Sequence, residues 1–181
     1  MGIIKEPNPV KFFIAVLFEN TSVLETMIPQ LEKEFGPIQW RSPIIDFTHT
    51  NYYQEIGEKL KRIFLVFREL FDPADLARRK ILTNQLEIQS GDAQKIRKIN
   101  LDPGYFDGGK IVLATTKNFS HRVYIGKGIY AEATIRWEKG DFRPFEYTYP
   151  DYGSKEYRPS LIQIRNLYRE DLSQSHTNEV V

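Results

Sequence analysis

Cysteine is absent from the chain, and methionine and tryptophan occur only twice each. The lack of cysteine excludes disulfides, thiolate metal sites and a cysteine nucleophile. Long hydrophobic runs are also lacking, because the longest apolar stretch, Phe12–Phe18, is far shorter than the ~20 residues of a membrane helix. Met1–Lys11 has no apolar run of the secretory type. These absences predict a cytoplasmic protein with no membrane partner.

An excess of charge of either sign is missing as well. The sequence has 25 basic and 24 acidic residues, for a net charge of +1. It therefore has no overall field that would attract nucleic acid or anionic lipid. This balance argues against nucleic acid as a partner.

What the chain does have is an aromatic content of 13%, with 12 phenylalanines and 10 tyrosines, which predicts an aromatic core or binding face. Its 181 residues suffice for one well-packed domain and are short for two. No repeat or linker divides the sequence, so residues 1–181 are expected to form a single domain. The polar residues at about 173–181 are expected to form a frayed tail.

The first half of the chain predicts six elements in the order β-α-β-β-α-β. Apolar spacing and turn residues place them at Val10–Phe18, Ser22–Phe35, Ile38–Phe47, Leu60–Arg68, Pro73–Ser90 and Ile96–Leu101. This order is that of the ferredoxin-like split βαβ arrangement. Pro43 interrupts the second strand and predicts an edge position or a bulge there.

In the second half, the turn-forming run Asp102–Gly104 predicts a reversal of the chain. Four further strands are expected at Lys110–Thr116, His121–Ile125, Ile129–Trp137 and Phe142–Tyr149. A last helix is expected from Ser160 to about Tyr168. The predicted fold class is therefore α+β: a ferredoxin-like βαββαβ N-terminal half, extended by antiparallel strands with a hairpin and by a C-terminal helix.

The run Gly104–Lys110 matches G-x-x-x-x-G-K, the core of a P-loop. Ile111 follows it, however, where a P-loop carries Ser or Thr for magnesium. The residues from Ile111 onward also predict a strand, whereas a P-loop opens a helix whose N-terminal amides hold the phosphate. The run is therefore expected to form a turn that leads into a strand, and P-loop nucleotide binding is not expected.

The glycines of Gly126–Gly128 predict a three-residue hairpin loop that pairs Tyr124 with Tyr130 and Arg122 with Glu132. This register is favoured because it separates an apolar face from a polar one. The apolar face would hold Val123, Ile125, Ile129, Ala131, Ala133, Ile135 and Trp137, and the polar face Arg122, Tyr124, Tyr130, Glu132 and Thr134. The polar face is either a solvated surface with one ion pair or the floor of a pocket. The sequence leaves both open.

Acids, a base, a cation and phenols concentrate between residues 100 and 152. The candidates for acid–base catalysis are His121, Glu132 and Asp102. The candidates for ligand binding are Arg122, Tyr124, Tyr130, Tyr149, Asp151 and Tyr152. A divalent metal is left open, because Asp102, His121, Glu132 and Asp151 could bind one only if the fold brings them together, and their spacing matches no known ligand motif.

Five segments of the sequence resemble the motifs of a family of uncharacterised prokaryotic proteins of about this length. They are Asn100–Tyr105, Val112–Lys117, His121–Tyr124, Gly128–Glu132 and Thr148–Tyr152. Gly57–Phe67 and Thr83–Asn84 are similar too, so the resemblance spans most of the chain. The family is a domain of unknown function, and the GTP-binding label of some members has no basis here beyond the incomplete Gly104–Lys110 loop. The resemblance implies functional roles for Asp102, His121, Arg122, Glu132 and Asp151.

The sequence thus predicts a protein that binds a small anionic or phosphorylated ligand, and it leaves open whether the protein is an enzyme. Arg122 would bind the anionic group, His121 or Glu132 would act as base, and Asp102 would orient the ligand or bind a metal. One alternative is an RNA-binding or RNA-processing accessory, because aromatic residues on ferredoxin-like sheets can stack on bases. Another is a non-catalytic interaction module, and homo-oligomerisation is left open.

Overall fold

The computed structural model describes residues 2–48, 53, 55–91 and 96–178, with side chains as far as Gln174. The strands are β1 (Val10–Phe18), β2 (Ile38–Arg41), β3 (Ile45–Asp46), β4 (Lys61–Phe71), β5 (Ile99–Phe106), β6 (Lys110–Thr115), β7 (Val123–Gly126), β8 (Ile129–Glu138) and β9 (Asp141–Pro144). The helices are α1 (Thr21–Phe35), the 3-10 turn η1 (Pro73–Asp75), α2 (Leu76–Gln89) and α3 (Arg158–Asn178). Among the described residues, no helix is long and apolar enough to span a membrane.

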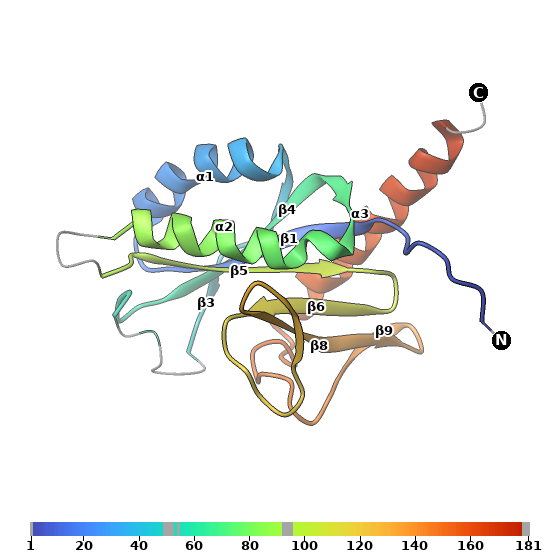
Figure 1. Cartoon of the computed structure of the whole chain (residues 1–181). Helices are drawn as coiled ribbons and strands as arrows, with labels where there is room; N and C mark the ends of the chain where they lie inside the picture. The colour runs from blue at the N-terminus through green and yellow to red at the C-terminus, as the bar shows by residue number, and fades with distance from the viewer. Residues whose placement is uncertain (1, 49–52, 54, 92–95, 179–181) are drawn as a thin grey trace.

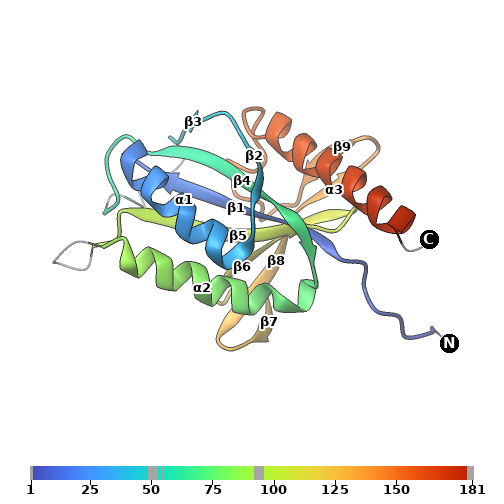
Figure 2. The same ribbon diagram turned by 90° about the horizontal axis from the view of Figure 1, so that it is seen from above.

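The strands form one sheet with helices on both faces (Figures 1 and 2). Successive side chains of a strand point to opposite faces. Accordingly, Phe12 and Ile14 of β1 pack in the core under α1 and α2. Phe13 and Ala15 pack in a second core under α3. The central strand is therefore apolar on both sides, which explains the unbroken hydrophobic run in its sequence.

The strand order β2-β4-β1-β5, with every neighbouring pair antiparallel, is compatible with the predicted ferredoxin-like start. The sheet continues through β6, β8 and β7, and β9 pairs with β8. The predicted α+β class, with antiparallel strands and a C-terminal helix added to this start, is confirmed. The predicted interruption at Pro43 is also confirmed, because β2 and β3 flank it and both pair with β4 near the edge of the sheet.

The residue types of Asp102–Gly104 predict a turn, and this prediction is wrong. The run forms the middle of β5. β5 pairs with β1 along its length, whereas its pairing with β6 begins only at Gly104. Pro103 is tolerated because the adjoining part of β5 has no β6 partner that would need a backbone N–H. A Cβ at Gly104 would lie 2.5 Å from Leu113 Cδ2 and 2.7 Å from the Val112 carbonyl oxygen, so close strand packing requires glycine there.

The P-loop-like run is expected to form a turn that leads into a strand, and this holds for its end only, because Gly104–Phe106 belong to β5 and the turn is formed by residues 107–109. Asp107 Oδ1 accepts hydrogen bonds from the backbone N–H groups of Gly109 and Lys110, both at 2.9 Å. Lys110 is the first residue of β6 and does not open a helix. The helix N-terminus on which a P-loop depends is therefore not formed by this run.

The β7–β8 hairpin keeps the predicted pairing of Tyr124 with Tyr130. Its turn is shorter than expected, because Lys127–Gly128 forms a two-residue turn with φ angles of 54° and 77°. The extra residue, Ile125, becomes a bulge in β7. Val123, predicted on an apolar inner face, is 68% exposed because β7 is the edge strand.

A second bulge divides β8. Ile111 pairs with Ile135 and Val112 pairs with Ala133, so Thr134 is an extra residue in β8. The prediction of one continuous apolar face along β8 is therefore wrong. Apolar residues before the bulge pack with α2, and those after it pack with α3.

Helix α3 is longer than the predicted Ser160–Tyr168, since it begins at Arg158 and continues to Asn178. Leu172, partly buried, extends the contact of this helix with the core beyond Tyr168. Residues 173–178, predicted as part of a frayed tail, therefore belong to the helix, and residues 179–181 lie outside the described part of the chain.

Candidate functional site

A cavity of about 520 Å³ lies where β5 and β6 separate. The two strands pair only as far as Gly104 and Leu113. Beyond that point, Asn100 and Asp102 of β5 and Thr115 of β6 line the cavity. Its volume lies within the ~300–1,000 Å³ of small-molecule sites. Among the described residues, the charged ones in its lining are Arg62, Lys80, Arg97, Lys117, Arg122, Glu87, Asp102, Glu132 and Asp151.

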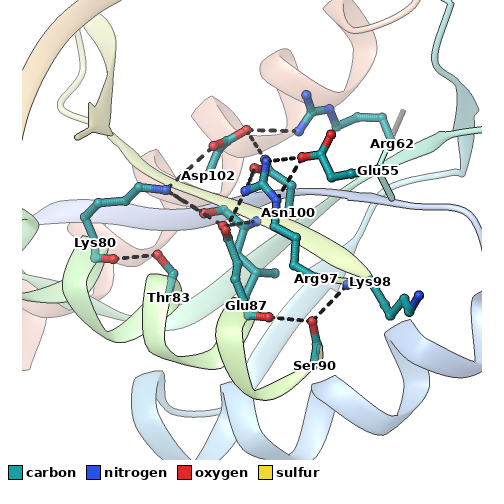
Figure 3. A network of polar contacts seen from close by, with 11 residues as sticks. Glu55, Arg62, Lys80, Thr83, Glu87, Ser90, Arg97, Lys98, Asn100 and Asp102 are labelled. Carbon is teal, nitrogen blue, oxygen red and sulfur yellow. Dashed lines mark hydrogen bonds and ion pairs between the residues drawn. The ribbon is translucent and has the colours of Figure 1, made fainter. Parts of the chain in front are cut away.

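Side chains of α2 satisfy the backbone groups that the strand separation leaves without a partner. The backbone N–H of Leu101 donates to Glu87 Oε1 at 2.7 Å, and its carbonyl accepts from Lys80 Nζ at 3.0 Å. Figure 3 shows Lys80 and Glu87 reaching from α2 to this part of β5. Buried backbone groups need such partners. The two side chains therefore take the place of a neighbouring strand and hold the opening between β5 and β6.

Four charged groups form the inner cluster, which we define as Arg62, Lys80, Asp102 and Asp151. Arg62 is 2% exposed, and its terminal amino groups lie 3.5 Å from Asp102 and 3.6 Å from Asp151. Its Nε donates to the Tyr157 hydroxyl at 3.0 Å. Burial by itself would lower the pKa of Arg62, but the hydroxyl and the carboxylates outweigh it and raise that pKa. Arg62 therefore stays charged and holds β4 to β5 and to the loop before α3.

Arg97 closes another side of the cavity. It donates to Glu87 at 2.7 Å, to Asn100 at 2.9 Å and to Glu55 at 2.9 Å (Figure 3). Burial raises the pKa of Glu87, although Lys80 and the Leu101 N–H act in the opposite direction. Glu87 thus contacts two cations and one backbone amide at a buried position.

The hairpin contributes Arg122 and Glu132 to the cavity. Glu132 is 4% exposed, and its Oε2 accepts from Arg122 Nε at 2.7 Å and lies 3.1 Å from His121 Nε2. The other two Arg122 nitrogens donate to the Lys117 carbonyl at 3.0 Å and to the Tyr149 hydroxyl at 3.1 Å. The predicted contact of Arg122 with Glu132 is present as an ion pair, although Arg122 precedes β7 and is not part of a strand. The Arg122 side chain is only 7% exposed.

The residues predicted for a site do not all meet in this cavity. Six of them line it: Asp102, Arg122, Glu132, Tyr149, Asp151 and Tyr152. His121 contacts Glu132 from outside the lining and stacks on Tyr147, with ring centres 4.2 Å apart. Tyr124 and Tyr130 do not line the cavity and contact each other, with ring centres 5.4 Å apart. The exposed position of Tyr124, at 59%, follows from its place on the edge strand.

Four charged lining residues come from the first half of the chain and were not predicted: Arg62, Lys80, Glu87 and Arg97. One signal for them is present in the sequence. Leu76, Lys80, Thr83 and Glu87 recur at intervals of three and four residues, and all four are buried. Charged residues at the core-facing positions of a helix indicate paired charges or a site.

The condition on which a metal site is left open, that Asp102, His121, Glu132 and Asp151 come together, is not met in the described residues. There, no group of three or more His, Asp or Glu side chains is arranged to hold a metal ion. Instead, Asp102 and Asp151 pair with Arg62, and Glu132 pairs with Arg122. Each of these carboxylates thus pairs with an arginine side chain.

Residues 8–168 match the model of a family described as a domain of unknown function (DUF4416). The chain belongs to this family. The match confirms the resemblance to an uncharacterised family, and it includes every described residue that lines the cavity. No curated protein and no solved structure matches the chain.

Proposed function

We propose that this protein binds a small ligand with a phosphate or carboxylate group in the cavity between β5 and β6. The observation that carries the proposal is the position of Arg122. Its Nε is held by the buried carboxylate of Glu132, so the guanidinium is fixed in orientation at the cavity wall. An arginine held in this way is suited to bidentate binding of an anionic group.

The other hydrogen-bond acceptors of Arg122 are ones that a ligand anion could replace. Its two terminal amino groups donate to neutral oxygens, the Lys117 carbonyl and the Tyr149 hydroxyl. Tyr149 is 52% exposed, so its hydroxyl can move aside into solvent. A phosphate or carboxylate would replace neutral acceptors with charged ones, and charge-assisted hydrogen bonds are roughly twice as strong. Burial lowers the pKa of Arg122, but its bonds to Glu132 and Tyr149 outweigh this and raise it, which favours the charged form.

We expect Arg122→Lys to weaken the binding of phosphate-bearing compounds by at least about tenfold, because lysine keeps the charge beside Glu132 but loses the paired donors. The measurement is a thermal-unfolding screen with inorganic phosphate, sugar phosphates and nucleoside monophosphates. A ligand at 100 times its Kd should add about 2.7 kcal/mol to the stability of the wild type.

The matched control is Arg41→Lys. Arg41 pairs with Glu25 on the surface, where both side chains are largely exposed, and it does not line the cavity. The proposal fails if no anionic compound stabilises the wild type, or if the two variants respond alike.

Acid–base catalysis on the bound ligand is the second candidate function. It is supported by the contact between His121 and Glu132, in which a carboxylate orients an imidazole. Asp102 supplies a further carboxylate inside the cavity. The RNA-binding alternative has less support, because helices cover both faces of the sheet at β1 (Figure 2).

We expect His121→Gln to retain ligand affinity and to reduce ligand conversion by at least about 100-fold. The conversion of a bound ligand is followed by NMR in wild type and variant at the same occupancy. A wild type that binds ligand but never converts it would limit the function to binding.

A further inference from the structure

We infer that the ligand is a monophosphorylated polyhydroxy compound, a sugar phosphate, whose hydroxyl groups bind Tyr152 and Asp102. This inference rests on the proposed binding of an anionic group at Arg122 and adds the chemistry of the rest of the ligand. It is carried by a buried hydroxyl without a partner, an open carboxylate oxygen and the charge balance of the inner cluster.

The hydroxyl belongs to Tyr152, which lines the cavity and is 4% exposed. Within the described part of the chain, this hydroxyl has no hydrogen-bond partner. Buried hydroxyls are almost always hydrogen-bonded, because an unpaired one loses its contacts with water and gains nothing in return. Burial raises the pKa of Tyr152, so the phenol is neutral and can both donate and accept. A ligand hydroxyl in the cavity would supply the missing partner.

The carboxylate belongs to Asp102, whose side chain is 26% exposed. Its Oδ2 accepts from Asn100 at 2.7 Å and from Arg62 at 3.5 Å. Its Oδ1 lies 3.8 Å from Lys80 Nζ, which is too long for a hydrogen bond. Among the described residues, Oδ1 of Asp102 thus has no hydrogen-bond donor, and a ligand hydroxyl in the cavity could donate to it.

The formal charge of the inner cluster indicates which kind of ligand group can bind there. The inner cluster contains two cations, Arg62 and Lys80, and two anions, Asp102 and Asp151, so its formal charge is balanced. An ammonium group or a second phosphate placed there would be repelled by two of the four groups and would leave the cluster with an unbalanced charge. Neutral hydroxyls can donate to Asp102 and pair with Tyr152 without disturbing this balance.

The described lining residues agree with a single anionic group on the ligand. Five of them are basic and four are acidic, which leaves one formal positive charge. Lys117, an exposed residue of the lining, follows β6, and its backbone carbonyl accepts from Arg122. The phosphate is therefore assigned to the Arg122 side of the cavity and the hydroxyls to the inner cluster. The rings of Phe47, Tyr53 and Tyr149 give the lining apolar surfaces for the carbon skeleton.

Isothermal titration calorimetry of the full chain with ribose 5-phosphate and with inorganic phosphate tests the inference. We expect ribose 5-phosphate to bind at least about tenfold more tightly than phosphate, because two further hydrogen bonds form. Tyr152→Phe should weaken ribose 5-phosphate binding about three- to tenfold, the effect of one hydrogen bond, and should not change phosphate binding. The matched control is Tyr105→Phe, because Tyr105 lies on β5 outside the lining.

Asp102→Asn serves as a second variant, with its folding verified by circular dichroism, and should also weaken only the sugar phosphate. Equal affinities for the two probes, together with no effect of Tyr152→Phe, would overturn the inference and leave the anion site at Arg122 standing. If neither probe binds, the proposed binding of a phosphate group at Arg122 fails together with this inference.

Discussion

Replacing Asp171 with alanine should lower the free energy of unfolding by about 3–5 kcal/mol, the cost of leaving a buried charge without its partner. The charge is that of Lys11 in β1, which is fully buried and pairs with Asp171 of α3. Among the described residues, the other acceptor of Lys11 Nζ is the Arg68 carbonyl oxygen, at 2.9 Å. Gln39 also donates to Asp171, at 3.1 Å, and would lose this acceptor.

The same variant should show a distinct dependence on pH. Burial lowers the pKa of Lys11, and Asp171 partly offsets that effect. Without Asp171, the pKa of Lys11 in the folded state falls further below its unfolded value. Between those two values the unfolded state binds more protons, so the stability rises as the pH rises. The variant should therefore recover part of its loss between neutral pH and about pH 10, near the ordinary pKa of lysine.

Urea unfolding at both pH values measures this effect. Glu170→Ala provides the control, because Glu170 is an exposed acid next to Asp171 on the same helix. The double variant Lys11→Met/Asp171→Leu removes both charges and should stay within about 1–2 kcal/mol of the wild type. A loss of less than about 1 kcal/mol in Asp171→Ala would show that this pair does not hold α3 on the sheet.

Much of this architecture follows from local patterns. Apolar spacing predicts the six elements of the first half, and Pro43 correctly predicts an interruption of the second strand. The pairing of Tyr124 with Tyr130 and the contact of Arg122 with Glu132 follow from the alternation of residue types around the hairpin. Register is predictable there because a slip by one residue would exchange the two faces.

The errors arise where a neighbouring strand overrides local preference. Asp102–Gly104 has the composition of a turn, yet β1 pairs with it and makes it a strand. Proline is tolerated at position 103 because β6 does not pair with β5 there. The residues around Pro103 give no information about where that pairing ends. The bulge at Thr134 likewise depends on how β8 meets β6. Such features require knowledge of which strands are neighbours.

The sequence did not predict the first-half residues of the cavity for a similar reason. Arg62 and Lys80 lie among apolar residues, where a lone charge is costly, and each becomes acceptable only through carboxylates far away in the sequence. A sequence shows the charged residue at a core-facing position but not its partner. Charged residues at buried positions on β4 and α2 were thus the available signal for the first-half part of the cavity.

Glu87 provides the strongest test of how this cavity is built. Glu87→Ala should lower the free energy of unfolding by about 3–5 kcal/mol. The Leu101 N–H would lose its acceptor at 2.7 Å, and Arg97 would lose a partner at 2.7 Å. Lys80, whose side chain is 7% exposed, would lose one of its two carboxylates. The opening between β5 and β6 would then contain unpaired donors.

Glu87→Gln separates the hydrogen bond from the charge. Its amide oxygen can still accept from Leu101, so its stability should remain within about 1–2 kcal/mol of the wild type. Burial raises the pKa of Glu87 in the folded state, so the folded protein binds more protons above the ordinary glutamate pKa of about 4.3. The stability that protonation of Glu87 contributes to the folded state is therefore fully present below that pH. It is lost as the pH rises through the raised pKa of Glu87. Glutamine does not titrate, so the stability of Glu87→Gln relative to the wild type should improve over this range.

Urea unfolding between about pH 4 and pH 7 measures both variants, with Glu25→Ala as a surface control that should cost less than about 1 kcal/mol. If Glu87→Ala is no more destabilising than Glu25→Ala, α2 does not hold the strands apart. If Glu87→Ala is destabilised while Glu87→Gln is not, the acceptor for the Leu101 N–H is the essential part. The cavity would then exist because one side chain of α2 replaces a neighbouring strand, and its charge would serve the network around Arg97 and Lys80.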